Sequence, residues 1–441
     1  MKDKDYVLGV IKENNIKFIT LWFTDILGFL KGFTITAKEA EHALNDGMNF
    51  DGSSIEGFAR IDESDMVAMP DPSTFQIIPW KVGDNVVMAR MFCDIYKPDG
   101  APYEGDPRYV LKKVLKKAND LGYTFYVGPE LEYFYFKDSK NTIALDSGGY
   151  FDLTPLDMGS NLRKETILAL ESMGIDVEYS HHEVANSQHE LDLRYTDALT
   201  MADNAMTYRM IVKKVAANHG VYATFMPKPV FGQNGSGMHV HQSLFKDNKN
   251  SFFDTDDKYH LSITAKKYIA GLLKHAPEFT LITNQWINSY KRLVPGYEAP
   301  IYLTWAYCNR SDLIRIPAYK EGKENSIRVE YRSPDPACNP YLAFAVMLNA
   351  GLSGMINNYE LVEPVEGNVY KLSDEERIKL GIRTLPPDLY SAIKLAESSE
   401  LVRDTLGEHI FDKLIENKKI EWNNYRIQIS SYEIEQYLPI L

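Results

Sequence analysis

The chain has few cysteines and no long apolar segment. Its three cysteines, Cys93, Cys308 and Cys338, are scattered without CxxC spacing, so neither a disulfide framework nor a zinc–thiolate site is indicated. No run of about eighteen apolar residues occurs, and the first residues, M-K-D-K-D-Y-V-L, lack the apolar region of a signal peptide. We therefore expect a protein of the reducing cytoplasm that does not enter a membrane.

Three common motifs are also missing. The sequence contains no Walker A motif, and Gly235-Ser236-Gly237 lacks the third glycine of a dinucleotide-binding loop. His182-Glu183 and His189-Glu190 each lack the histidine that zinc proteases place three residues beyond the glutamate. These absences argue against the P-loop, dinucleotide-binding and zinc-protease classes.

Positive charge is scarce overall, since the formal net charge is −13 at pH 7. This balance argues against nucleic acid or an anionic membrane as the main partner, although it permits a local basic pocket for ATP. The chain has 441 residues, of which 44% are hydrophobic and 25% charged. That is enough for two or three domains with a substantial core.

A stretch rich in glycine and proline, residues 99–107, is the best candidate for a domain boundary. It predicts two domains, which cover residues 1–102 and 103–441. The first is expected to contain strands at 17–24, 29–35 and 85–94, a helix at 37–45 and a loop at 50–58. The second opens with a helix capped by Asp106, and further helices are expected near 158–173, 197–218, 262–275, 340–358 and beyond 373. The interleaving of helices with strands that are joined by hairpin-like loops predicts an α+β fold with a mainly antiparallel sheet.

Four expected strands carry charged or imidazole side chains on one face and apolar side chains on the other. The polar faces hold Glu130 and Glu132; Glu190, Asp192 and Arg194; His239, His241 and Ser243; and Arg328, Glu330 and Arg332. Any one of these faces could be a solvated surface. Like charges side by side cost energy unless a cation lies between them, so the repetition of acids predicts a metal site.

The candidate ligands are rich in oxygen, which favours Mg²⁺ or Mn²⁺ over zinc. They are Glu130, Glu132, Glu183, Glu190, Glu330 and His239. Clustered carboxylates without thiolates suit a multi-metal site that handles phosphate groups. Several arginines could bind carboxylate and phosphate there, although each alone could equally form a surface salt bridge: Arg292, Arg310, Arg315, Arg328 and Arg332. The residues alone predict a metal-dependent enzyme that transfers phosphoryl groups.

Six longer motifs together resemble glutamine synthetase, type I. They are F-D-G-S-S-I-E-G-F, P-E-L-E, H-H-E-V-A, K-P-V-F-G-Q-N-G-S-G-M-H-V-H, N-S-Y-K-R-L-V-P-G-Y-E-A-P and R-V-E-Y-R-S-P-D-P. The resemblance implies synthesis of glutamine from L-glutamate, ammonia and ATP through a γ-glutamyl phosphate intermediate. It also implies a β-grasp-like N-terminal domain, an α+β catalytic domain and a dodecamer of two stacked hexameric rings with active sites between subunits.

The resemblance implies two or three metal ions, Mg²⁺ or Mn²⁺, in each active site and assigns ligands to two of them and to the two larger substrates. One metal would be held by Glu132, Glu183 and Glu190, and the metal on the ATP phosphates by Glu130, His239 and Glu330. Glutamate would be bound by Asn234, Gly235, Arg292, Arg310 and Arg332, with Glu132, His239 and Glu298 beside it. The nucleotide would be bound by Glu178, Tyr195, His241, Ser243, Arg310, Arg315 and Arg328.

Ammonium would lie among Asp51, Ser54, Tyr150 and Glu183. Asp51 would take its proton, and Glu298 would close over the intermediate, since an acyl phosphate exposed to water hydrolyses. Asp51, Glu298 and Arg310 are therefore the expected catalytic residues. Tyr150 and Tyr195 could equally be packing residues, and Ser54 could simply stabilise its turn.

The sequence departs from the longer type I enzymes in two places. Arg383, in G-I-R-T-L-P, stands where those enzymes carry an adenylylated tyrosine, and Asn325 stands where they place an ATP-contacting lysine, a role that Lys323 could fill. Both departures resemble the short, unadenylylated subgroup. There Arg60 would be a candidate for feedback sensing by glutamine, although an exposed arginine beside acids is an equal alternative. Small regulatory proteins are possible partners.

Two other functions have to be weighed. A γ-glutamyl ligase for amines or polyamines would share the acyl phosphate but replace ammonia. Asp51, Ser54 and Tyr150, which make a small cationic pocket, argue against it. A non-catalytic structural or regulatory relative would have no reason to keep all six metal ligands.

Overall fold

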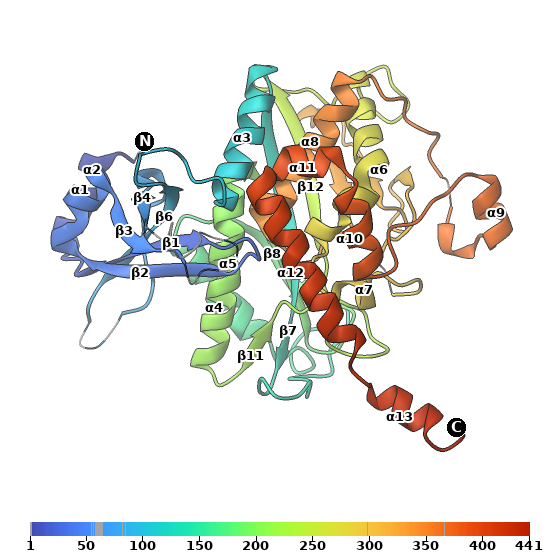
Figure 1. Ribbon diagram of the computed structural model, residues 1–441, viewed down its shortest axis with the longest axis horizontal. Coiled ribbons are helices and arrows are strands. Elements are labelled where there is room, and N and C mark those ends of the chain that lie inside the picture. Colours follow the sequence, from blue (N-terminus) through green and yellow to red (C-terminus); the bar gives the residue numbers. More distant parts are fainter. Residues whose placement is uncertain are drawn as a thin grey trace.

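The structure is a computed structural model that describes residues 2–53, 55, 57, 65–81, 83, 85–297, 299–365 and 367–441. It contains two β-sheets, a smaller one formed by the N-terminal residues and a larger one covered by helices (Figure 1). Ser54, Arg60 and Glu298 lie outside the described residues. Within the described part of the chain, no helix combines the length and apolar character needed to cross a membrane.

The N-terminal sheet has the strand order β2-β1-β6-β4-β3, and β5 pairs with β6. Its strands are β1 (Phe18–Thr24), β2 (Leu30–Thr36), β3 (Met48–Asp51), β4 (Asp65–Pro70), β5 (Gln76–Ile77) and β6 (Met88–Tyr96). Only the β1–β6 pair is parallel. Helices α1 (Lys4–Glu13) and α2 (Ala40–Asp46) accompany this sheet. Asp25 closes the turn between β1 and β2 by accepting hydrogen bonds from the amides of Leu27 and Phe29.

The larger sheet has the order β14-β15-β16-β12-β7-β9-β8, and all its pairs except β14–β15 are antiparallel. Its main strands are β7 (Thr124–Phe136), β8 (Val177–His182), β9 (Gln188–Leu193), β12 (Met238–Lys246), β14 (Trp305–Tyr307), β15 (Ile314–Ile316) and β16 (Val329–Tyr331). Three short strands extend it: β10 (Thr196–Asp197), β11 (Tyr222–Thr224) and β13 (Lys249–Asn250). The predicted α+β class with a mainly antiparallel sheet is confirmed.

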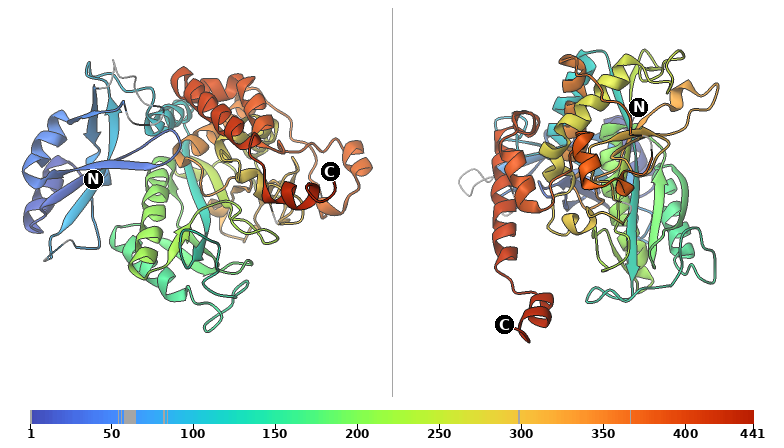
Figure 2. Two further views of the ribbon diagram at one scale, coloured as in Figure 1. Left: turned by 60° about the horizontal axis from the view of Figure 1, so that its bottom comes forward. Right: turned by 90° about the vertical axis from the view of Figure 1, so that its right-hand side faces the viewer.

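Most of the remaining helices lie where the sequence predicts them, but the short helix Ser289–Arg292 falls outside the predicted ranges. The remaining helices are α3 (Pro107–Asp120), α4 (Ser160–Ser172), α5 (Ala198–Asn218), α6 (Ile263–Thr283), α7 (Ser289–Arg292), α8 (Pro340–Ile356), α9 (Asp374–Lys379), α10 (Leu389–Glu397), α11 (Glu400–Leu406), α12 (Glu408–Arg426) and α13 (Ser431–Tyr437). Helix α6 continues to Thr283, past the predicted end at 275, because the added turns are buried. Helix α13 projects from the body at the C-terminus (Figure 2).

Helices α6 and α8 form the centre of the core and cross very closely. A Cβ atom on Gly271 would lie 2.1 Å from the carbonyl oxygen of Ala350, so only glycine allows this approach. Helix α8 is apolar on all sides and almost entirely buried, as expected for a helix inside a core. The apolar faces of the central strands pack into the same cluster, for example Leu131, Leu191 and Val240. Their polar faces are left for the site.

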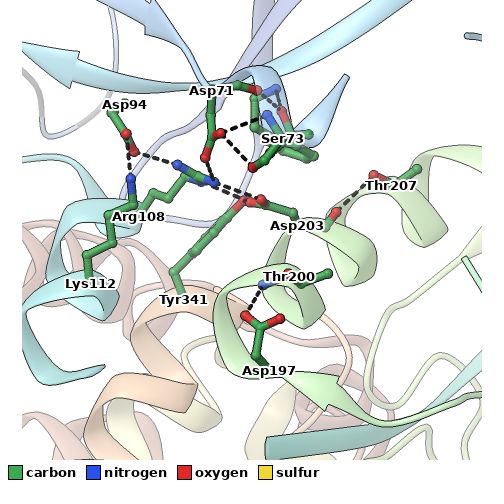
Figure 3. A network of polar contacts seen from close by, with 12 residues as sticks. Asp71, Ser73, Asp94, Arg108, Lys112, Asp197, Thr200, Asp203, Thr207 and Tyr341 are labelled. Carbon is green, nitrogen blue, oxygen red and sulfur yellow. Dashed lines mark hydrogen bonds and ion pairs between the residues drawn. The ribbon is translucent and has the colours of Figure 1, made fainter. Parts of the chain in front are cut away.

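A buried ion-pair network joins the two sheets through Arg108 of α3 (Figure 3). The Arg108 guanidinium, 3% exposed, contacts Asp71 and Asp94 from the N-terminal sheet region and Asp203 of α5, at 2.8, 2.6 and 3.0 Å. The hydroxyl of Tyr341 in α8 donates to Asp203 as well. One cation therefore connects segments that lie far apart in the sequence.

Candidate active site

Polar side chains of neighbouring strands stand beside one another in rows across one face of the larger sheet. The register aligns Tyr179, Asp192, Glu130 and His239 in one row, from β8, β9, β7 and β12. It aligns His181, Glu190 and Glu132 in a second row, and His241, Glu330 and Arg315 in a third. Directly opposite residues share a face, so the predicted alternation brings these groups together.

The first compact group is formed by Glu130, His241 and Glu330, whose nearest ligand atoms all lie within 4.8 Å of one another. His241 Nε2 lies 2.6 Å from one oxygen of Glu130, and His239 Nδ1 lies 3.0 Å from the other. His239 Nδ1 is also 3.9 Å from Glu330. Arg315 and Arg332 both pair with Glu330. The predicted set of Glu130, His239 and Glu330 is thus assembled, with His241 as an additional neighbour.

The electrostatics of this group favour the charged carboxylates. Burial opposes ionisation of Glu130, but His241 and His239 outweigh it and hold the pKa of Glu130 well below its usual range. Burial also opposes ionisation of Glu330, and there Arg332 and His241 prevail and lower the pKa to about 2. Two anionic groups with imidazole nitrogen beside them form a donor set that suits a divalent cation.

The second compact group is His181, Glu183 and Glu190, again within 4.8 Å. Glu132 stands opposite Glu190 in its row, and one of its oxygens accepts hydrogen bonds from Gln188 Nε2 at 2.8 Å and from the amide of Gly237 at 3.0 Å. Burial and the charge of Glu183 raise the pKa of Glu132 well above its usual range. Burial, Asp192 and Glu132 do the same for the pKa of Glu190. Carboxylates that repel one another in this way fit a bound cation.

Asp192 was placed on this face by the alternation but was given no role. Its buried carboxylate stands between Tyr179 and Glu130 in the first row. His181 was not singled out either. Its position opposite Glu190 depends on the pairing of β8 with β9, which no sequence pattern specified.

A third group, Asp146, His182 and His189, also lies within 4.8 Å, but it does not fit a cation. One Asp146 oxygen is already bonded to His182 Nε2 and to the amide of Ser187. The cationic Arg163 guanidinium lies 2.7 Å from His189 Nδ1. These residues form a hydrogen-bonded support behind the second group rather than a metal site.

Arginines line the other side of the site. Arg292 is 2% exposed and donates to the carbonyl oxygens of Ser333 and Arg332. A Cβ atom on Gly237 would lie 2.6 Å from the Arg292 guanidinium, so the glycine loop after β11 has to approach it closely. The Tyr150 hydroxyl hydrogen-bonds with Arg310 and raises its pKa. Arg310 thus lies beside the expected ammonium residue Tyr150.

A cavity of about 270 Å³ opens next to the first group. Its lining contains Glu178, Tyr195, His241, Ser243 and Arg328, five of the residues expected to bind the nucleotide. Asn325, which departs from the type I pattern, lines it too, whereas Arg310 and Arg315 do not belong to the lining. Arg328 Nε donates to His241 Nδ1 at 3.1 Å, which links this cavity to the first group.

Asp51 is not brought to the metal groups within one chain. It ends β3 in the N-terminal sheet, where its side chain is exposed and accepts a hydrogen bond from the amide of Ser53. Figure 1 shows β3 well apart from β8. Of the expected ammonium residues that the structure describes, Tyr150 and Glu183 are brought together through His181. The His181 ring lies 5.4 Å from the Tyr150 ring, and its Nδ1 lies 3.6 Å from Glu183.

Comparison with known families gives two matches that divide the chain between them. A family described as "Glutamine synthetase, beta-Grasp domain" matches residues 15–98. One described as "Glutamine synthetase, catalytic domain" matches residues 104–437. Together they cover both sheets described above.

Curated relatives and solved structures agree with these matches. A "Glutamine synthetase" of Mycolicibacterium smegmatis is 53% identical over 100% of both chains, and one of Methanosarcina mazei is 52% identical over 99% of this chain and 98% of the relative. A solved structure titled "GmaS/ADP complex-Conformation 1" has a TM-score of 0.90 at 29% identity over 100% of both chains. A cryo-EM structure of Plasmodium falciparum glutamine synthetase has a TM-score of 0.89 at 26% identity over 99% of both chains.

Proposed function

The chain belongs to the glutamine synthetase family, and on this premise we propose which of its residues carry the reaction. The reaction itself is the ATP-dependent ligation of ammonia to the γ-carboxylate of L-glutamate, with γ-glutamyl phosphate as intermediate. The alternative of a γ-glutamyl-amine ligase is not favoured, because relatives named glutamine synthetase share about half of the sequence over its full length.

The two compact groups are proposed to hold the metals, Mg²⁺ or Mn²⁺. Glu132, Glu183 and Glu190 would hold one ion, and Glu130, His239 and Glu330 the other. His181 and His241, the other members of the two compact groups, stand beside these sets. When bound, such ions neutralise phosphate oxygens as charge develops on them.

The arginines are proposed to hold the two anionic substrates in line. Arg292 and Arg332 would bind the glutamate carboxylates beside Asn234 and Gly235, supported by the burial of both guanidinium groups. ATP would occupy the cavity lined by Tyr195, Ser243 and Arg328, with Glu178 and His241 on its wall. Arg310, in the loop after β14, and Arg315, on β15, would bind the phosphates of ATP. This orientation brings the γ-carboxylate to the γ-phosphate without a covalent enzyme intermediate.

Ammonium is proposed to enter beside Glu183 and Tyr150. Asp51 of a neighbouring subunit would take its proton before the amine attacks the acyl phosphate, and Ser54 would accompany it. Glu298 would close the site against water. The support for a shared site is the separation, within one chain, of β3, which ends at Asp51, from β8 (Figure 1). Arg60 is kept as a candidate for sensing glutamine.

We also propose a homo-oligomer, a dodecamer of two hexameric rings, because a shared active site requires neighbouring subunits. The C-terminal segment supports it, because Ile427, Ile429, Leu438 and Ile440 are 74–76% exposed in the single chain. The division of the chain between residues 102 and 103 is also proposed. It is supported by a separate hydrophobic cluster of residues 7–103, although Trp22, Ile26, Leu27 and Phe92 pack with the larger cluster. ATP as co-substrate favours a cytoplasmic location, and small regulatory proteins remain candidate partners.

The observation that carries this proposal is the pair of acid–imidazole groups on adjacent rows of one sheet. Steady-state assays should show glutamine formation with ammonium and Mg²⁺, and much slower turnover with a panel of larger amines. Glu190→Gln should abolish glutamine formation, whereas Glu171→Gln, an exposed acid on α4, should leave it unchanged. Turnover of the Glu190 variant at the wild-type rate would refute the assignment of the metal groups.

A further inference from the structure

The segment between β7 and α4, residues 146–158, is fixed at both ends by one buried carboxylate. The Asp146 side chain is 1% exposed. Its Oδ1 accepts hydrogen bonds from His182 Nε2 and from the amide of Ser187, both at 3.0 Å, and its Oδ2 accepts one from the amide of Met158, also at 3.0 Å. The first residue of the loop thus binds the last residues of the loop and the β8–β9 hairpin at the same time.

The turn of the β8–β9 hairpin contacts Asp146 through Ser187. Ser187 is fully buried and has a φ of +59°. This left-handed backbone conformation is rare for residues other than glycine. The Ser187 Oγ accepts a hydrogen bond from the Asp146 amide at 2.7 Å. A Cβ atom on Gly148 would lie 2.8 Å from His182 Nε2, so the loop packs on the hairpin with no spare room. The amide of Phe151 donates to the carbonyl of His182.

The middle of the loop is largely exposed to solvent. Its large apolar side chains are 43–79% exposed: Tyr150, Phe151, Leu153, Leu156 and Met158. A second anchor, the Asp157–Arg163 pair at 2.6 Å, holds only the end next to α4. Tyr150 contacts the His181 ring and Arg310, but the backbone that carries it is fixed to the hairpin by the contacts of Asp146 and by the Phe151 amide.

Tyr150 in turn stands where the acceptor amine is proposed to enter. Its ring lies 5.4 Å from the His181 ring, and His181 lies 3.6 Å from Glu183. The same hairpin carries Glu183 and Glu190, while the loop carries Tyr150. The contacts between Asp146, His182 and Ser187 thus set the distance between the Tyr150 loop and the hairpin that carries Glu183.

We propose that Asp146 is a positioning residue that fixes the Tyr150 loop on the hairpin and so limits the acceptor amine to ammonia. The inference rests on the proposed placement of ammonium beside Tyr150 and Glu183. A loosened loop would admit a small primary amine such as methylamine. The reaction would then convert glutamate, methylamine and ATP into γ-N-methylglutamine, ADP and phosphate.

The test compares Asp146→Asn with Asp152→Asn in the assembled full-length enzyme. Asp152 lies on the same loop, but among the described residues its carboxylate accepts a hydrogen bond only from the amide of Gly149 within the loop. Asp146→Asn should raise KM for ammonium and lower the ratio of kcat/KM for ammonium over methylamine by about tenfold, with KM for ATP unchanged, because a pocket separates ligands that differ by one methyl group by about 10–200-fold. Asp152→Asn should keep the wild-type ratio.

Hydrogen exchange supplies a readout independent of activity. Amides of residues 147–156 should exchange faster in Asp146→Asn, while those of β7 stay protected. If that variant does not assemble, Ser187→Gly removes the hydroxyl at a position whose φ suits glycine, and the same shift in amine preference is expected. An unchanged amine ratio in either folded variant would overturn the inference. A wild-type enzyme that forms no glutamine would instead overturn the proposed function.

Discussion

Replacing Arg108 with methionine removes a buried guanidinium that joins the N-terminal sheet to helices α3 and α5. Three carboxylates lose a partner, and they do so to different extents. Asp203 is 6% exposed and keeps only the Tyr341 hydroxyl, whereas Asp71 and Asp94 are about a fifth exposed, and Asp94 keeps Lys112. Water can reach the latter two, so Asp203 dominates the loss.

Breaking a buried ion pair by removing one partner costs about 3–5 kcal/mol, because an uncompensated charge stays buried. Since only one of the three carboxylates is fully enclosed, we expect Arg108→Met to lower the free energy of unfolding by about 4 kcal/mol rather than by a multiple of that. The loss should affect the junction first, because both sheets depend on this residue.

Urea unfolding of the assembled protein at one fixed protein concentration measures this loss. Lys116→Met is the matched control on the same helix. Its pair with Asp120 is exposed on both sides, and exposed pairs contribute at most about 1 kcal/mol. A loss below about 1 kcal/mol for Arg108→Met, or one equal to that of the control, would refute the reasoning about burial.

Three further predictions follow from single contacts. Glu330→Gln should lower glutamine formation at saturating Mg²⁺ by at least about 100-fold, because it removes the charge of a proposed metal ligand. The same carboxylate pairs with Arg315 and Arg332. Turnover near the wild-type rate would contradict this prediction. Asp51→Ala and Glu183→Ala oligomers should each be inactive, but unfolding and reassembling them in equal amounts should restore roughly a quarter of the activity if each site is shared, and persistent inactivity of mixed oligomers would argue for a site within one chain. Burial and the charge of Asp94 raise the pKa of Asp106 to about 7, so the folded state holds this proton more tightly than the unfolded chain and stability should fall as the pH rises from about 4 to 7. Asp106→Asn should flatten that part of the urea stability profile, and equal slopes in the two proteins would show that another group is responsible.

The polar rows of the site could be read from the sequence because a strand repeats every two residues. Alternation alone placed Glu130 with Glu132 and His239 with His241 on one face. It could not say which residue stands opposite which, because that depends on pairing between strands far apart in the chain. The place of His181 beside Glu190 came only with the register of β8 and β9.

Some elements of the N-terminal sheet could not be predicted from the sequence either. The acidic, proline-containing stretch at 63–72 was not expected to form a strand, yet Asp65–Pro70 is β4, enclosed between β3 and β6. Helix α1 was also missed, although Asp3 caps it and Val7 and Ile11 give it a buried stripe. Short amphipathic helices give a weak signal in sequence, and tertiary packing decides whether they form. The roles carried over by resemblance for Ser54, Arg60 and Glu298 stay predictions.

The register between β8, β9 and β7 has a consequence for recombining this enzyme with its relatives. The residues of each proposed metal group lie on more than one strand. A chimera with its crossover between residues 183 and 188 would therefore pair β8 of one enzyme with β9 of another. A shift of one residue in that pairing would turn Glu190 and Asp192 toward the helices and Leu191 toward the substrates. Chimeras should therefore exchange residues 124–193 as one block, which carries β7, the Tyr150 loop, β8 and β9 together.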